Sequence, residues 1–179
     1  MTTHARPLSS PLPAARAALL VFGCAALTAI AAQVAIPLPF TPVPLTLQTL
    51  AVFLAAALLP PAAAALSQAL YLGAAAAGAP ILAGGVALAA VSGATFGYLV
   101  GFAVAAAIVS WGLRRASASR ARAGLAFAGG SLAVLACGSA WLGVALHVGP
   151  AQAFALGAAP FLPGEALKVL AALALWRRA

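Results

Sequence analysis

The one acidic residue and the one lysine of this 179-residue chain, Glu165 and Lys168, lie three positions apart near the C-terminus. Pro163 precedes them and is tolerated in the first turn of a helix, and an apolar run then continues to Trp176 without a helix breaker. Because Glu165 and Lys168 are three positions apart, both charges lie on one face of this predicted helix. Glu165 lies in the first turn, where the helix dipole favours an anion. The pair is the leading candidate for a functional site.

The predicted depth of this pair makes its charges costly. If Arg177 and Arg178 mark a membrane surface, Glu165 lies about 16 Å from Trp176 along the helix, near the middle of a hydrocarbon core ~30 Å thick. A charge at that depth costs ~2.5–3.5 kcal/mol on insertion scales, so it marks a functional site by default. The alternative is an ion pair that only pins two helices together, although apolar residues would fill that role at lower cost.

Composition predicts an all-α integral membrane protein. Hydrophobic residues make up 65% of the chain and charged residues 6%, with a net charge of +8, whereas a soluble domain is about 25% charged. The arginines lie at the ends of apolar segments without interleaved aromatic residues, so the positive-inside rule explains them better than nucleic-acid binding does. We expect a multi-pass protein of the cell inner (plasma) membrane that contacts lipid and has no nucleic-acid partner.

Proline, glycine and arginine divide the chain into segments. Residues 1–13 are predicted to be a cytoplasmic tail and residues 14–178 a single membrane domain of six transmembrane helices. An even number of spans separates the arginine groups, so both termini are predicted to be cytoplasmic. Cleavage after Ala29-Ile30-Ala31 is the alternative to an intact first span, and the intact span is preferred. The predicted spans are residues 14–36, 46–59, 62–77, 94–113, 124–146 and 163–176.

Two loops are predicted on the side opposite the arginines. Residues 37–44 contain four prolines and predict a stiff extended connector, whereas residues 78–93 are rich in glycine. Irregular backbone at membrane depth must be buried in protein or face a cavity. We therefore expect the 37–46 and 78–93 loops to roof a pocket over the start of the last helix.

A stripe of small residues, Gly93, Gly97 and Gly101, begins the predicted fourth span. Such a stripe allows either a ligand or another helix to approach the backbone closely. We predict that its backbone borders the pocket, with close helix packing as the alternative. Thr95 and Tyr98 lie beside the stripe and offer a hydroxyl group, a phenol and an aromatic face.

The remaining chemistry of the chain favours a binding subunit. Cys24, Cys137 and His147 are isolated in the sequence, so neither a metal nor another cofactor is expected. Glu165 has no second acid for acid–base catalysis, which argues against an enzyme. Lys168 follows no Walker A motif, so energy for transport must come from other subunits. The alternative is a stand-alone channel or facilitator for a different small solute, but one charged pair at one depth is unlike a pore.

Three segments carry a family resemblance: IPLPFTPVPLTLQTL at residues 36–50, GYLVGF at residues 97–102 and PFLPGEALK at residues 160–168. They resemble the signature segments of the BioY family, the biotin-binding S components of energy-coupling-factor (ECF) vitamin transporters. The resemblance extends over roughly residues 14–178. It implies an ECF S-component-like bundle that binds biotin from outside and works with a transmembrane coupling protein and ABC-type ATPases.

The resemblance also implies which residues bind biotin. It assigns Glu165 and Lys168 to the binding site, although the family usually has Asp where this chain has Glu165, which places the carboxylate one methylene further out. A carboxylate can accept hydrogen bonds from the ureido ring and a cation can pair with the biotin carboxylate, but which residue meets which end stays open. Phe40 and Tyr98 suit the apolar parts of biotin, and Thr95 and Gln48 complete the predicted contacts. No covalent chemistry is implied.

Overall fold

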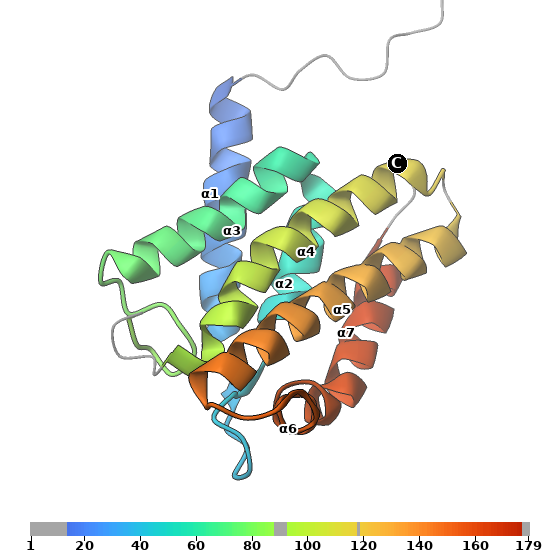
Figure 1. Ribbon diagram of the computed structural model, residues 1–179. Helices are drawn as coiled ribbons and strands as arrows, with labels where there is room; N and C mark the ends of the chain where they lie inside the picture. Colours follow the sequence, from blue (N-terminus) through green and yellow to red (C-terminus); the bar gives the residue numbers. More distant parts are fainter. Residues whose placement is uncertain (1–13, 88–92, 118, 177–179) are drawn as a thin grey trace, which may run out of the picture.

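The computed structural model describes residues 14–87, 93–117 and 119–176 as a bundle of α-helices (Figure 1). A short antiparallel pair of strands, β1 (Ala35–Ile36) and β2 (Leu45–Thr46), joins the first two helices. The predicted all-α class is therefore confirmed. The helices are α1 (Ala14–Ala32), α2 (Gln48–Leu58), α3 (Pro61–Ala76), α4 (Phe96–Arg115), α5 (Arg120–Ala145), α6 (Pro150–Gly157) and α7 (Leu162–Leu175), with 3-10 turns η2 (Gly93–Thr95) and η3 (Ala159–Phe161).

Proline sets several of the helix boundaries. Pro61, Pro150 and Pro163 lie in the first turns of α3, α6 and α7, where the missing N–H costs no helical hydrogen bond. Leu59 and Pro60 adopt extended backbone angles and separate α2 from α3. The predicted start of the last helix near Pro163 is confirmed.

Among the described residues, four helical segments are long and apolar enough to cross a membrane by length and composition: Ala14–Ala32, Gly93–Arg115, Arg120–Ala145 and Pro150–Leu175. Helices α2 and α3 have 11 and 16 residues. At ~1.5 Å per residue they extend about 16 and 24 Å, less than a hydrocarbon core of ~30 Å. The chain is a multi-pass membrane protein, whereas the count of six spans stays a prediction.

Some predicted boundaries differ from the observed ones. The connection between the predicted spans 94–113 and 124–146 is partly helical, because α4 continues through Arg115 and α5 already begins at Arg120. Ser119 caps α5 by accepting a hydrogen bond from the Arg122 backbone N–H, and arginine is itself a good helix former. The connection between the predicted spans 124–146 and 163–176 contains the short helix α6. Helix α1 ends at Ala32, because the chain then enters β1.

The two ends of the bundle differ in character. One end, which we call the arginine end, holds the start of α1, the α4–α5 turn and the end of α7 (Figure 1). The other, which we call the pocket end, holds the β1–β2 hairpin, residues 78–87 and α6 (Figure 1). The arginines of the α4–α5 region therefore lie away from the proline- and glycine-rich loops, as the sequence predicts.

Helices α4 and α5 pack along most of their length, and glycines make that contact close. A Cβ atom added at Gly97 would overlap Trp141, and one added at Gly101 would lie 3.1 Å from Val134 Cα. On α5, a Cβ atom at Gly138 would overlap the ring of Tyr98. These glycines let the two backbones meet, and the pair of helices forms the scaffold on which the pocket end is built.

Candidate functional site

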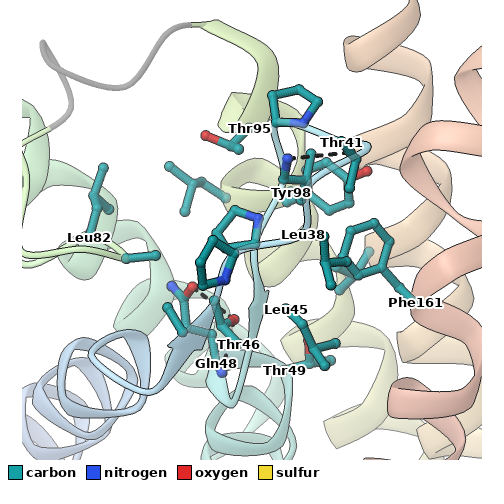
Figure 2. A pocket seen from close by; sticks show the side chains of 18 of the residues that line it. Leu38, Thr41, Leu45, Thr46, Gln48, Thr49, Leu82, Thr95, Tyr98 and Phe161 are labelled. Atoms are coloured by element: carbon teal, nitrogen blue, oxygen red, sulfur yellow. Dashed lines mark hydrogen bonds between the residues drawn. The ribbon is translucent and has the colours of Figure 1, made fainter.

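A cavity of about 470 Å³ lies at the pocket end of the bundle. Its walls come from the β1–β2 hairpin, residues 82–86, the start of α2, the η2–α4 segment, the middle of α5 and the η3–α7 segment. Figure 2 shows Leu38 and Leu45 of the hairpin between Leu82 on one side and Phe161 on the other. A cavity of this size, mostly apolar with a few polar groups, suits a small-molecule ligand.

The charged pair of α7 lines this cavity. Lys168 Nζ donates a hydrogen bond of 2.6 Å to Glu165 Oε1 across one helical turn. Both residues are buried, at 5% exposure for Glu165 and 8% for Lys168. Gly164, the residue before Glu165, packs against Leu45 so closely that an added Cβ atom would lie 2.9 Å from its side chain. This contact sets the start of α7 directly against the hairpin.

Two hydroxyl groups from other helices also bind the Glu165 carboxylate. Thr49 of α2 donates a hydrogen bond of 3.0 Å to Oε1, and Ser131 of α5 donates one of 2.8 Å to Oε2. Both hydroxyl residues are buried. Hydrogen bonds to an ionised group are stronger than neutral ones, and they offset part of the cost of burying the charge.

A second polar chain connects the hairpin to α3 and to the loop after it. Thr46 donates to Gln48 Oε1 at 3.1 Å, and Gln48 Nε2 donates to the Tyr71 hydroxyl at 2.8 Å. That hydroxyl in turn donates to the backbone carbonyl of Ile81 at 3.3 Å. Gln33 at the end of α1 donates to the same carbonyl. The chain of bonds fixes the backbone at Ile81, next to Leu82 of the cavity wall.

Aromatic side chains form another wall. Tyr98 of α4 and Phe161 of η3 both line the cavity, with ring centroids 6.4 Å apart in an edge-on arrangement. The Tyr98 hydroxyl donates a hydrogen bond of 2.6 Å to the carbonyl of Gly157, the last residue of α6. This bond satisfies a carbonyl group at a helix C-terminus, where the last carbonyl groups have no N–H partner within the helix. The Tyr98 ring therefore lines the cavity while the proton of its hydroxyl is donated to the protein.

The structure gathers most of the predicted site residues around one cavity. Glu165, Lys168, Tyr98, Thr95 and Gln48 all line it, from four separate elements. Gln48 and Lys168, the two that are farthest apart in the sequence, are separated by 120 positions, and the bundle brings them together. Their roles in binding stay predictions.

Four further predicted residues lie elsewhere. Phe40 is 57% exposed at the tip of the hairpin and lies outside the cavity lining, because the proline-rich turn directs neighbouring side chains, such as Thr41 and Leu38, toward the cavity instead. Gly97 and Gly101 face α5, which corresponds to close helix packing, the alternative reading of the stripe. Gly93 accepts a hydrogen bond from the indole of Trp141 on α5.

Sequence reasoning missed Thr49, Ser131 and Tyr71. Each lies in a mostly apolar helix, and no helical spacing links Thr49 or Ser131 to Glu165, or Tyr71 to Gln48, because the partners are 116, 34 and 23 positions apart. The signal available was a general one: a polar side chain in a membrane span needs an internal partner. Applied to these three positions, it would have marked them as candidates without naming their partners.

Comparisons with known proteins find relatives of this chain. The model of the BioY family matches residues 1–179. A probable biotin transporter BioY from Lysinibacillus sphaericus is 44% identical over 91 residues, covering 51% of this chain and 45% of that protein. The biotin transporter BioY2 from Lactococcus lactis is 35% identical over 147 residues, covering 82% of this chain and 80% of that protein.

A solved structure shares the fold. The crystal structure of the S component for biotin from an ECF-type ABC transporter matches with a TM-score of 0.82 at 21% sequence identity, covering 92% of each chain. At that identity the likeness concerns the architecture of the bundle. Together with the match to the family model over the whole chain, it leads to one assignment: this chain belongs to the BioY family.

Proposed function

We propose that this chain is the biotin-binding S component of an ECF-type uptake transporter and that it captures biotin in the cavity at the pocket end. The observation that carries the proposal is the buried Glu165–Lys168 pair, which lines a cavity of small-molecule size in a member of the BioY family. The protein is a transport protein rather than an enzyme.

The chemistry of the cavity suits biotin. Biotin has two ureido N–H donors, a ureido carbonyl and a carboxylate, and the charged pair offers both an acceptor and a cationic donor. The thioether ring and the valeryl chain are apolar, as are the walls formed by Leu38, Leu82 and the ring of Phe161. Burial of those walls against the ligand supplies affinity, and the few polar groups supply orientation.

The proposal includes partners that supply energy and a route across the membrane. The sequence has no Walker A motif, so this chain does not bind ATP through a P-loop. We propose that a transmembrane coupling protein and ABC-type ATPases complete the transporter. Purification of the tagged protein from its native membrane, followed by mass spectrometry of the proteins that accompany it, tests this part.

Ligand identity is tested by equilibrium binding of labelled biotin to the detergent-purified protein. We expect a dissociation constant below micromolar, with no competition from an excess of riboflavin or thiamine. Retention of another vitamin in place of biotin would show that the substrate assignment is wrong while the family assignment stands.

The proposed topology has six spans, both termini in the cytoplasm and the pocket end outside. Cysteine labelling with a membrane-impermeant reagent in spheroplasts tests it, in a background with Cys24 and Cys137 replaced by alanine. Phe40→Cys should react from outside, because Phe40 is exposed at the pocket end, whereas Ser117→Cys at the arginine end should react only after permeabilisation. External labelling at position 117 contradicts the topology.

A further inference from the structure

Three helices meet at one carboxylate. Glu165 on α7 accepts hydrogen bonds from Thr49 on α2, from Ser131 on α5 and from Lys168 one turn further along α7. The two hydroxyl groups reach Glu165 from 116 and 34 positions away in the sequence. All four side chains are buried. The position of the carboxylate is therefore determined by the packing of the bundle and not only by the rotamer of Glu165.

Counting donors and acceptors separates the roles of the two charges. A carboxylate has about four acceptor positions, and three of those on Glu165 are occupied by protein donors. An ammonium group has three N–H donors. Within residues 14–87, 93–117 and 119–176, the one hydrogen bond that Lys168 makes is to Glu165. Two N–H donors of Lys168 thus remain for a ligand, while most hydrogen-bond acceptor positions of Glu165 are already occupied by protein donors.

We infer that Thr49 and Ser131 are positioning residues for the ligand site. They fix the Glu165 carboxylate, the carboxylate fixes the Lys168 ammonium group, and Lys168 contacts an acceptor oxygen of the ligand. That the ligand is biotin rests on the proposed function, and both its carboxylate and its ureido carbonyl are acceptors of the required kind. The positioning itself concerns only side chains of this chain and is testable without a ligand.

The structural alternative is that the two hydroxyls only tie helices together. Ser110 shows what such a residue looks like in the same bundle: its buried hydroxyl donates a hydrogen bond of 2.6 Å to the carbonyl of Leu59 between α2 and α3, away from the cavity. Ser110→Ala is therefore the matched control for Ser131→Ala. Thr49→Ser, which keeps the hydroxyl, is the matched control for Thr49→Val.

The first arm of the test uses the fact that Lys168 is the one lysine of the chain. Acetylation by acetic anhydride, followed by mass spectrometry, reports its reactivity, with the α-amino group as internal reference. We expect Thr49→Val and Ser131→Ala to raise the rate at Lys168 several-fold in the ligand-free protein, because the ion pair is held less firmly. Ser110→Ala and Thr49→Ser should leave the rate unchanged. Equal rates in all variants would overturn the positioning role.

The second arm measures labelled-biotin affinity in a double-mutant cycle with Glu165→Gln. Thr49→Val and Ser131→Ala should each lower affinity on the order of tenfold, the scale of a lost hydrogen bond to a charged group. In the Glu165→Gln background the same changes should have little further effect, because they act through the carboxylate. If Thr49→Val and Ser131→Ala still lower biotin affinity to the full extent in the Glu165→Gln background, or if Ser110→Ala lowers it equally, the hydroxyl groups serve general packing.

The two arms separate the two claims. If the parent protein does not bind biotin, the proposed function is wrong, and the acetylation rates alone decide whether Thr49 and Ser131 position the pair. If biotin binds and the cycle is additive, the function stands and the positioning role is rejected. Thermal unfolding of each variant confirms that the rates and affinities are measured on folded protein.

Discussion

The pocket end and the arginine end are built from the same apolar helices but differ in the kind of side-chain contact that predominates. At the pocket end, the chain is irregular, and buried polar side chains pair with one another around a cavity. Toward the arginine end, α4 and α5 are regular, and an apolar cluster is centred on Phe53 and Phe127, whose ring centroids are 5.4 Å apart. The exposed Arg115 stacks there on Trp111, with its guanidinium carbon 3.9 Å from the ring centroid.

The comparison indicates that binding and packing are carried by separable sets of residues. Removal of a polar group at the pocket end should change ligand affinity more than stability. A packing change near the arginine end should do the reverse.

The largest effect is expected for Lys168→Ala. Loss of one partner from a buried, hydrogen-bonded charge pair costs ~2–5 kcal/mol, so biotin affinity should fall about 30- to 5,000-fold. The variant should still insert and purify, because the scaffold of α4 and α5 is untouched. Equilibrium binding of labelled biotin measures the loss, and Arg115→Ala at the other end is the control that should bind like the parent. A Lys168→Ala protein with near-parent affinity contradicts this role.

A smaller effect, on stability rather than affinity, is expected for Gly112→Val near the arginine end. A Cβ atom at Gly112 would lie 2.6 Å from Ala126 Cβ, an atom that cannot move without the helix backbone. Such overpacking typically costs ~1–3 kcal/mol. Thermal unfolding in detergent should show a lower midpoint, with biotin affinity of the folded fraction unchanged.

Gly73→Val is the control for that change. Gly73 lies on α3, and among the described residues no atom outside its own helix turn lies within 4 Å of an added Cβ, so the same substitution has room there. Its unfolding midpoint should stay near that of the parent. If Gly73→Val and Gly112→Val are equally destabilised, the loss comes from helix propensity or membrane insertion and not from the α4–α5 contact.

The smallest effect is expected for Tyr98→Phe. It removes the hydrogen bond from the Tyr98 hydroxyl to the Gly157 carbonyl but keeps the ring that lines the cavity. We expect a loss of about 1 kcal/mol in stability and biotin affinity within about threefold of the parent. An affinity loss as large as that of Lys168→Ala would mean that the phenol binds the ligand directly.

The parts of the fold that could be predicted from sequence are those governed by local rules. Pro60 and Pro163 separate or begin helices because proline lacks an N–H, and long apolar runs in a chain with 6% charged residues predict a membrane bundle. The exact boundaries near Arg115 and Arg120 could not be predicted, because arginine is compatible with both a helix and a loop. Helix α6 is too short to stand out from its surroundings.

The site was predictable only in part. Glu165 and Lys168 stand out because they are unique in the sequence and three positions apart. Thr49 and Ser131 do not, since their distance from Glu165 becomes short only when α2, α5 and α7 pack together. The outward direction of Phe40 depends on the turn geometry of a segment with four prolines, which composition does not determine.

The most direct test of the pocket as a charge-dependent binding site is the biotin affinity of the double variant Glu165→Gln, Lys168→Met. This change removes both charges together, so neither is left buried and unpaired, and the bundle should fold with near-parent stability. We predict that the folded double variant binds biotin at least about tenfold more weakly than the parent protein, the scale of one lost hydrogen bond between a ligand and a charged group. Parent-like affinity in the double variant would contradict a role of the pair in ligand binding and would reduce it to a contact between helices.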